Sequence, residues 1–145
     1  MSAETAHPRE FDIVLWGATG ATGRRVAHHL ATRIGGRGLR WAIGGRTREK
    51  LEAVRAGLPE AGRSVDILVG DSHDHDVMRA LAARTRVVIS TVGPFALYGT
   101  ALVEACAEAG TQYCDLTGEA QWMRSMIDGF EPRARETGAR IVHAC

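Results

Sequence analysis

Lysine is almost absent from this sequence: Lys50 is the single lysine among 18 basic residues, and all the others are arginines. Schiff-base catalysis needs a lysine amine. The Tyr-x-x-x-Lys pair of short-chain dehydrogenases needs a lysine four residues after a tyrosine, whereas Lys50 follows Arg46 at that spacing. Both mechanisms are therefore excluded on this segment.

Cysteine is also scarce, with only Cys106, Cys114 and Cys145 and no CxxC pair. An odd number at wide spacing makes neither a disulfide framework nor a zinc site. We interpret the three as buried small apolar residues in a reducing compartment. The stretch 71–76 is rich in Asp and His, but such residues at a helix start are more often caps and solvated charge than ligands. We therefore predict no metal site.

Long hydrophobic runs are missing too. No stretch approaches the roughly 18 apolar residues that span a bilayer, and the polar residues 1–10 lack the apolar region of a signal peptide. The formal net charge of +1 is too small for an electrostatic footprint on nucleic acid or an anionic membrane. We predict a cytoplasmic location, no transmembrane segment and no nucleic-acid partner.

What the sequence does contain is a regular alternation of short β-branched runs and longer amphipathic stretches. The predicted strands are 11–16, 40–44, 65–69, 86–92, 112–116 and 141–144. The predicted helices are 21–33, one from Thr47, one from Asp71 or Ser72, 98–109, and 120–137, which Pro132 is expected to divide. Repeated βαβ units predict an α/β fold, a Rossmann-type doubly wound parallel six-stranded sheet.

The chain reads as one domain. We expect residues 1–10 to be a flexible N-terminus and residues 11–145 to form an NAD(P)-binding Rossmann domain. The sequence stops at Cys145, at the carboxyl end of the last predicted strand, where an α/β sheet normally emits a ligand-contacting loop. We therefore expect a substrate domain to be absent from this chain, with a complete small protein as the alternative.

A glycine-rich turn joins the first strand to the first helix. The GxxGxxG spacing is a variant of the dinucleotide fingerprint: Gly17 permits a tight turn, Gly20 lets the backbone approach a pyrophosphate, and Gly23 lets the helix pack on the sheet. The helix N-terminus adds N–H groups and partial positive charge. A purely structural turn is the alternative. The predicted cofactor-binding residues of this turn are Gly17, Ala18, Thr19, Gly20, Ala21, Thr22 and Gly23.

The end of the second strand favours NADP over NAD. An NAD enzyme usually carries an acid there, for the ribose hydroxyls, but this sequence has Arg46 and no acid before Glu49. A guanidinium can grip a 2′-phosphate bidentately, and Thr47 can add a hydroxyl and a backbone N–H. An ordinary solvated arginine is the alternative for Arg46, and Arg24 and Arg48 are weaker candidates.

Later strand ends add further candidates. Asp71 is expected to contact adenine or to cap a helix. After the fourth strand, the nicotinamide side of the cofactor is expected to lie beside Thr91, Val92, Gly93 and Pro94. Phe95 and Tyr98 are candidates for a pocket wall or for packing against the absent domain.

The last strands carry polar side chains whose role the sequence leaves open. Asp115 and Glu119 fit a substrate pocket or helix capping equally well. His143 fits a core or sheet-edge position better than a catalytic one. The catalytic residues stay unknown.

Five segments in order resemble the saccharopine dehydrogenase-like oxidoreductases, and especially the trans-acting enoyl reductase group of actinobacteria. The segments are residues 11–23, 44–46, 93–99, 113–119 and the terminal 143–145, and the resemblance covers nearly all of the chain after residue 10. It implies an NADP-binding domain, cofactor NADPH, followed by a substrate domain.

The resemblance also implies functions. Enoyl reductases of this group reduce, in trans, double bonds of acyl chains carried by lipid-making polyketide synthases, whereas saccharopine-type relatives handle amino-acid adducts. The expected substrate is therefore a small molecule or a carrier-bound acyl chain. A full-length homodimer and membrane association of the full-length enzyme are compatible with it. A non-enzymatic domain that senses NADP is the alternative from another class.

Overall fold

Hydrophobic strands and amphipathic helices alternate along the chain in the computed structural model, which describes residues 8–145. The strands are β1 (Phe11–Trp16), β2 (Trp41–Gly45), β3 (Asp66–Val69), β4 (Thr85–Ser90), β5 (Gln112–Asp115) and β6 (Ile141–Val142). The helices are α1 (Ala21–Ile34), α2 (Arg48–Ala56), the 3₁₀ turn η1 (Glu60–Gly62), α3 (His75–Arg84), α4 (Phe95–Tyr98), α5 (Thr100–Ala109) and α6 (Ala120–Thr137).

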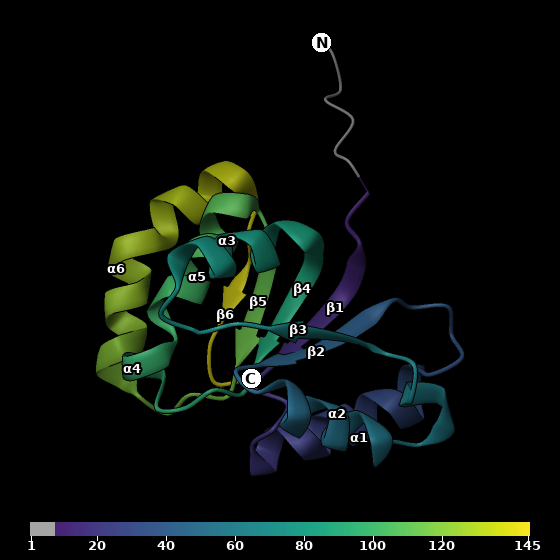
Figure 1. Ribbon diagram of the computed structural model, residues 1–145. Helices are drawn as coiled ribbons and strands as arrows, with labels where there is room; N and C mark the ends of the chain where they lie inside the picture. The colour runs from purple at the N-terminus through teal and green to yellow at the C-terminus, as the bar shows by residue number, and fades with distance from the viewer. Residues whose placement is uncertain (1–7) are drawn as a thin grey trace.

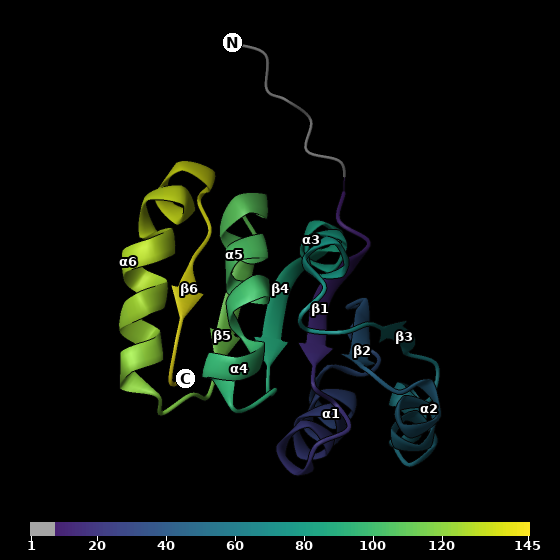
Figure 2. The same cartoon turned by 60° about the vertical axis from the view of Figure 1, so that its left-hand side comes forward.

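All six strands are parallel, in the order β3-β2-β1-β4-β5-β6. Helices α1 and α2 cover one face of this sheet, and α3, α5 and α6 cover the other (Figures 1 and 2). This is the doubly wound Rossmann arrangement, so the predicted fold class is confirmed. Successive strands are added in one direction from β1 to β3 and in the opposite direction from β4 to β6, so the strand order reverses between β1 and β4. Such folds bind ligands at this point, at the carboxyl ends of the strands.

Each face of the sheet has its own hydrophobic core, because alternate strand residues point to opposite faces. Leu15 and Ile43 pack with α1 and α2, whereas Val14 and Val88 pack with α3, α5 and α6. Burial on both faces explains why the central strands are almost wholly apolar in sequence.

Three predicted helix boundaries are wrong. The helix expected to begin at Tyr98 begins at Thr100, since Tyr98 is the last residue of the short helix α4 and Gly99 separates the two helices. The third helix begins at His75, and its N-cap is Asp74, which accepts hydrogen bonds from the backbone N–H groups of residues 76 and 77, not Asp71 or Ser72. Pro132 does not divide the last helix, which runs unbroken through it. Pro132 and Asp128 are both exposed, so the carbonyl that the proline leaves unpaired is open to water.

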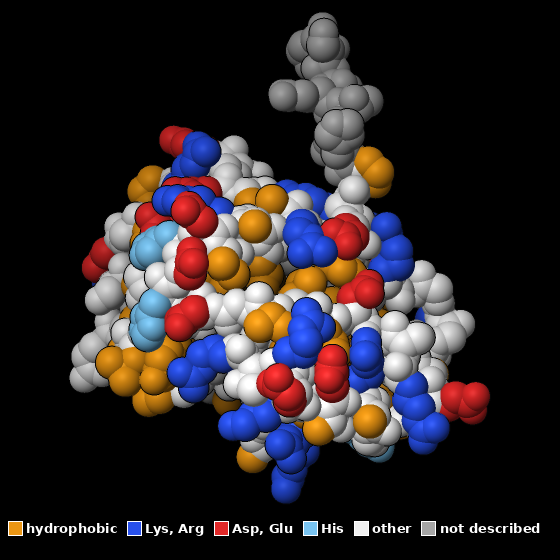
Figure 3. Space-filling view, viewed as in Figure 1, with side chains coloured by type: hydrophobic (Ala, Val, Ile, Leu, Met, Phe, Trp, Pro, Cys, Tyr) orange, Lys and Arg blue, Asp and Glu red, His pale blue; other side chains and the backbone are white. Residues whose placement is uncertain are grey.

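Ion pairs join the helices on one face. Acidic, basic and histidine side chains gather over α3 and α5 (Figure 3). Arg79 lies 3.4 Å from Glu108, and His75 lies 3.5 Å from Glu104. These pairs are solvent-exposed, so each contributes little to stability.

The start of the described chain is held in place. Residues 1–7 of the predicted flexible segment lie outside the described residues. Arg9 donates hydrogen bonds to the carbonyl oxygens of Ala82 (2.7 Å) and Ala109 (2.6 Å), near the C-terminal ends of α3 and α5. Glu10 pairs with Arg84 at 2.7 Å. These contacts attach Arg9 and Glu10 to the ends of α3 and α5.

Candidate cofactor-binding site

A cavity of about 380 Å³ opens at the carboxyl edge of the sheet, where the strand order reverses between β1 and β4. Loops after β1, β2, β3 and β4 form its walls. The lining residues are Trp16, Gly17, Thr19, Gly20, Gly45, Arg46, Ser72, Thr91, Val92, Gly93, Pro94 and Tyr98.

The glycine turn is packed so tightly on one side that it requires glycine. Gly17 has a φ of +96°, and a Cβ there would lie 2.6 Å from Val92 Cγ2 and 2.8 Å from Thr91 Oγ1. A Cβ at Gly23 would overlap the carbonyl oxygen of Gly17. Both glycines are therefore demanded by the protein's own packing, as the fingerprint predicts.

Gly20 differs from the other two glycines of the turn, Gly17 and Gly23. Its φ of −74° suits any residue, and a Cβ there would meet no protein atom closer than 3.7 Å. The fold itself does not require glycine at this position, which lines the cavity. A small residue here leaves room for a group outside the chain.

The N-terminus of α1 fits an anionic group beside Gly20. Gly20 is the N-cap and offers no side-chain hydrogen bond, and the first turn contains no acidic residue. The positive end of the helix dipole is therefore not neutralised by the helix's own side chains. This cradle fits the pyrophosphate of a dinucleotide.

Arg46 is the arginine that the structure places on the cavity wall, at the end of β2. It is exposed, and within residues 8–145 no acidic partner pairs with it. Of the weaker candidates, Arg48 lies 3.9 Å from Glu52, and Arg24 donates to the carbonyl oxygen of Thr19. Of the three candidate arginines, only Arg46 therefore lines the cavity, whereas Arg24 and Arg48 have other contacts.

Thr91 holds the glycine turn from the neighbouring strand. Its Oγ1 donates toward the carbonyl oxygens of Gly17 (3.0 Å) and Trp16 (3.3 Å), and its N–H donates to Trp16 O at 2.9 Å. The threonine therefore fixes the turn in addition to lining the cavity.

Sequence reasoning missed three lining residues: Trp16, Gly45 and Ser72. Trp16 Nε1 donates to Ser72 Oγ at 2.9 Å in a buried contact. A Cβ at Gly44 would lie 2.5 Å from the indole, so the glycine of β2 makes room for the ring. The sequence did contain two signals for this contact. Trp16 directly precedes the glycine turn, and Gly44 lies near the end of β2.

Some predicted residues lie outside the lining. They are Ala18, Ala21, Thr22, Gly23, Thr47 and Asp71. Ala18 is fully buried against α1. The carboxylate of Asp71 instead accepts a hydrogen bond from the N–H of His73 (2.8 Å) and lies 3.4 Å from its Nδ1. Thr47 is the N-cap of α2 without a side-chain cap bond.

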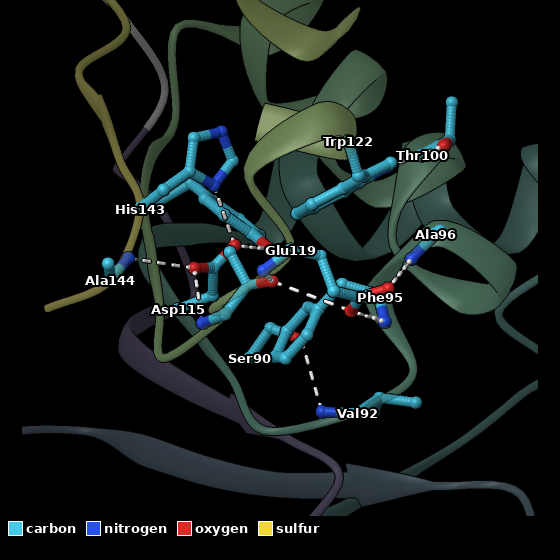
Figure 4. A network of polar contacts seen from close by, with 12 residues as sticks. Ser90, Val92, Phe95, Ala96, Thr100, Asp115, Glu119, Trp122, His143 and Ala144 are labelled. Carbon is cyan, nitrogen blue, oxygen red and sulfur yellow. Dashed lines mark hydrogen bonds and ion pairs between the residues drawn. The ribbon is translucent and has the colours of Figure 1, made fainter. Parts of the chain in front are cut away.

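Beyond this cavity, Asp115 is the centre of a group of polar contacts (Figure 4) that we call the Asp115 cluster. Its members are Tyr113, Asp115, Thr117, His143 and Ala144. The Asp115 carboxylate accepts hydrogen bonds from Tyr113 Oη (2.8 Å), His143 (2.7 Å from Nδ1), Thr117 N and Ala144 N. It is neither a helix cap nor open to the cavity.

The cluster shifts two pKa values. Burial opposes ionisation of Asp115, but the bonds from His143, Thr117, Tyr113 and Ala144 more than offset it, so its pKa is lowered. Burial, with the neighbouring Asp115 charge, raises the pKa of Tyr113 far above its usual range. The His143 side chain is 9% exposed and packs against Trp122, as expected of a core residue.

Glu119 reaches across to the loop after β4. Its carboxylate accepts hydrogen bonds from the backbone N–H groups of Phe95 (2.6 Å) and Ala96 (3.2 Å). Phe95 is buried and its ring lies 5.7 Å from that of Trp122, whereas Tyr98 lines the cavity. Glu119 therefore acts as a helix cap, one of its two predicted roles. The helix that it caps is α4 and not α6, which Glu119 directly precedes.

Of the three cysteines that the sequence predicts to be buried, only Cys106 is buried, whereas Cys114 is half-buried and Cys145 is exposed. Residues 8–145 contain no group of three His, Cys, Asp or Glu side chains arranged to hold a metal ion. None of their helices combines the length and the apolar character needed to cross a membrane.

A parallel sheet of this order, with a glycine turn at its point of reversal, defines a dinucleotide-binding domain of the Rossmann class. The particular family follows from comparison of the sequence. Residues 13–142 match the family model described as the saccharopine dehydrogenase NADP binding domain, so the chain belongs to that family. Its cofactor is therefore NADP(H), and the position of Arg46 agrees with this.

Similar proteins come from mycobacteria. The chain is 52% identical over 141 residues to a Mycobacterium tuberculosis protein that carries the provisional name trans-acting enoyl reductase. It is 47% identical over 137 residues to a trans-acting enoyl reductase of Mycobacterium bovis. These matches cover 97% and 94% of this chain but only 33% and 32% of the relatives. The chain thus spans about a third of their length.

Solved structures share the fold. The apo saccharopine dehydrogenase (L-Glu forming) of Saccharomyces cerevisiae superposes with a TM-score of 0.73 at 17% identity, covering 92% of this chain and 27% of that one. AtPrR2, solved with NADP+ and (+)pinoresinol, gives 0.61 at 14% identity, covering 93% of this chain and 49% of that one.

Proposed function

We propose that this chain is the NADPH-binding domain of an enoyl reductase that acts in trans on unsaturated acyl chains in lipid or polyketide synthesis. The 47–52% identity to proteins named trans-acting enoyl reductase supports this reaction class. Their greater length supports a substrate domain outside this segment. The lack of an assigned catalytic acid on residues 8–145 fits a chain that contributes mainly the cofactor site.

The observation that carries the proposal is that Arg46 and Gly20 line the same cavity. The end of α1 beside Gly20 offers N–H groups and positive potential to a diphosphate. The Arg46 guanidinium, free of an acidic partner among the described residues, can bind one further phosphate. Together they would hold NADPH with its ends in a defined order along the sheet edge.

In this proposal the chain positions the cofactor and excludes water, and the bound NADPH supplies the hydride. The loop after β4, with Thr91 and Pro94, would flank the nicotinamide half, because the second half of a Rossmann sheet holds that mononucleotide. The protein donor of the accompanying proton would come from the part of the relatives that this chain does not cover.

Calorimetric titration of the chain with NADPH, NADH and ATP tests the cofactor site. We expect NADPH to bind more tightly than NADH and ATP not to compete at equal concentration. Equal binding of NADPH and NADH would contradict the phosphate clamp.

A second experiment tests the reaction. The full-length protein that carries this domain is mixed with an enoyl chain on its acyl carrier, and NADPH consumption and the saturated product are followed. We expect turnover by the full-length protein and almost none by residues 1–145 alone. Turnover of an amino-acid adduct instead would favour a saccharopine-type activity. Binding without any turnover would favour an NADP sensor. Light scattering of the same sample tests for a homodimer.

A further inference from the structure

The Gly93–Pro94 turn is held from outside its own strand and helix. Both residues line the cavity and are exposed, and the turn leads into α4, a helix of four residues. Pro94, the N-cap of α4, provides no side-chain hydrogen bond. The first N–H groups of α4 therefore need acceptors from elsewhere.

Glu119 supplies these acceptors from the beginning of α6. Its Oε2 accepts from Phe95 N at 2.6 Å, and its Oε1 accepts from Ala96 N at 3.2 Å (Figure 4). Each carboxylate oxygen thus has its own backbone partner, and hydrogen bonds to an ionised acceptor are stronger than neutral ones. The two bonds fix both the position and the orientation of the chain that leaves Pro94.

The backbone at Glu119 is itself held in place. The Glu119 backbone N–H donates to Thr117 Oγ1 at 3.1 Å, and the Thr117 backbone N–H donates to the Asp115 carboxylate. One turn into α6, Trp122 packs against Phe95 and donates to Thr100 Oγ1 at 3.0 Å. The start of α6 therefore contacts α4 through Glu119 and Trp122. Of these two residues, Glu119 is the one that accepts hydrogen bonds from the backbone next to the cavity.

We propose that Glu119 is a positioning residue for the nicotinamide half of NADPH. It acts through the Gly93–Pro94 turn and does not touch the cofactor. This inference rests on the proposed function, since it takes the cavity as the NADPH site. The adenosine half is assigned to other elements, Arg46 and the glycine turn, so removal of the Glu119 carboxylate affects one half of the cofactor and spares the other.

Two ligands allow the adenosine half and the nicotinamide half of the site to be tested separately. NADPH has both halves, whereas 2′,5′-ADP has the adenosine and the 2′-phosphate but no nicotinamide. Both are titrated by calorimetry into the unaltered chain and into Glu119→Ala and Glu119→Gln. Glu136→Gln is the matched control, because Glu136 also lies on α6 but pairs with the exposed Arg133 far along the helix.

In Glu119→Ala we expect the Kd of NADPH to rise about tenfold, because two charge-assisted bonds to the turn are lost. The Kd of 2′,5′-ADP should stay within about twofold. Glu119→Gln, which keeps one acceptor oxygen, should fall between Glu119→Ala and the unaltered chain. The fluorescence of bound NADPH should shift toward that of free NADPH in both variants, and Glu136→Gln should change nothing.

Equal weakening of both ligands would overturn the inference, because it would show general loss of the fold. Unchanged NADPH affinity in a folded Glu119→Ala variant would overturn it as well. If Glu119→Ala fails to fold, the ratio of the two Kd values in Glu119→Gln decides by the same criteria. If the unaltered chain bound neither ligand, the proposed function would fail first, and the inference with it.

Discussion

His143 Nδ1 lies 2.7 Å from Asp115 Oδ2, joining the end of β5 to the residues that follow β6. The backbone reinforces this link, since Ala144 N donates to the same carboxylate and Cys145 N donates to Asp115 O at 2.8 Å. The edge strand β6 has only two residues. The Asp115 carboxylate therefore adds two contacts, to His143 and Ala144, to the short backbone pairing of β6 with β5.

Asp115→Ala should destabilise the domain strongly. The change leaves the buried donors of Tyr113 and Thr117 without an acceptor, and such losses cost about 1–3 kcal/mol per group. We expect the free energy of unfolding to fall by about 3 kcal/mol or more in urea titrations. Glu136→Gln is the surface control and should change it by less than about 0.5 kcal/mol. A similarly small effect of Asp115→Ala would show that water replaces the carboxylate.

Acid should weaken the domain through the same group. The pKa of Asp115 in the folded chain lies below the ordinary 3.8 of an aspartate. A carboxyl group with a lowered folded pKa stabilises the fold fully above its unfolded pKa, and this contribution is lost as the pH falls through the folded value. The urea midpoint of the unaltered chain should therefore fall more steeply below about pH 4 than that of Asp115→Asn. Parallel curves would contradict this.

Arg46→Ala should discriminate between the two nicotinamide cofactors. Loss of a bidentate contact to the 2′-phosphate should weaken NADPH binding roughly a hundredfold, equivalent to about 2.7 kcal/mol. NADH binding should change by less than about threefold. Arg48→Ala is the control, since Arg48 lies near Glu52 and does not line the cavity. Equal losses for both cofactors would refute the clamp.

Two glycines of the turn should respond in opposite ways. Gly20→Val should leave the sheet folded, because a Cβ at Gly20 makes only an ordinary contact with the Gly17 carbonyl oxygen at 3.7 Å, but it should abolish NADPH binding. Gly23→Ala should destabilise the fold itself, since its Cβ would overlap the Gly17 carbonyl. Circular dichroism melts and NADPH titrations on both variants measure the two effects. Unchanged affinity in Gly20→Val would show that the phosphates lie elsewhere.

Local signals in the sequence were sufficient for the fold. The bounds of β1 were predicted to the residue, and the helix end at Gly110 coincides with a glycine at φ +69°. Local signals failed where two of them compete. Asp71 and Asp74 are both good caps, and only the path of the chain after β3 makes Asp74 the N-cap of α3. A proline in a helix removes one backbone hydrogen bond, and this local energetic cost predicted a break at Pro132. Packing of the surrounding residues outweighs that cost, and α6 continues through Pro132.

The sequence by itself determined the α/β class, the parallel sheet implied by βαβ repeats and the glycine turn, because periodicity and backbone strain act between residues close in the chain. Only the tertiary structure decided which arginine faces the cavity, that Trp16 bonds Ser72, and that Glu119 caps a helix 24 residues away. Such contacts join distant parts of the chain. They depend on how the elements pack together, and no pattern of neighbouring residues contains that information.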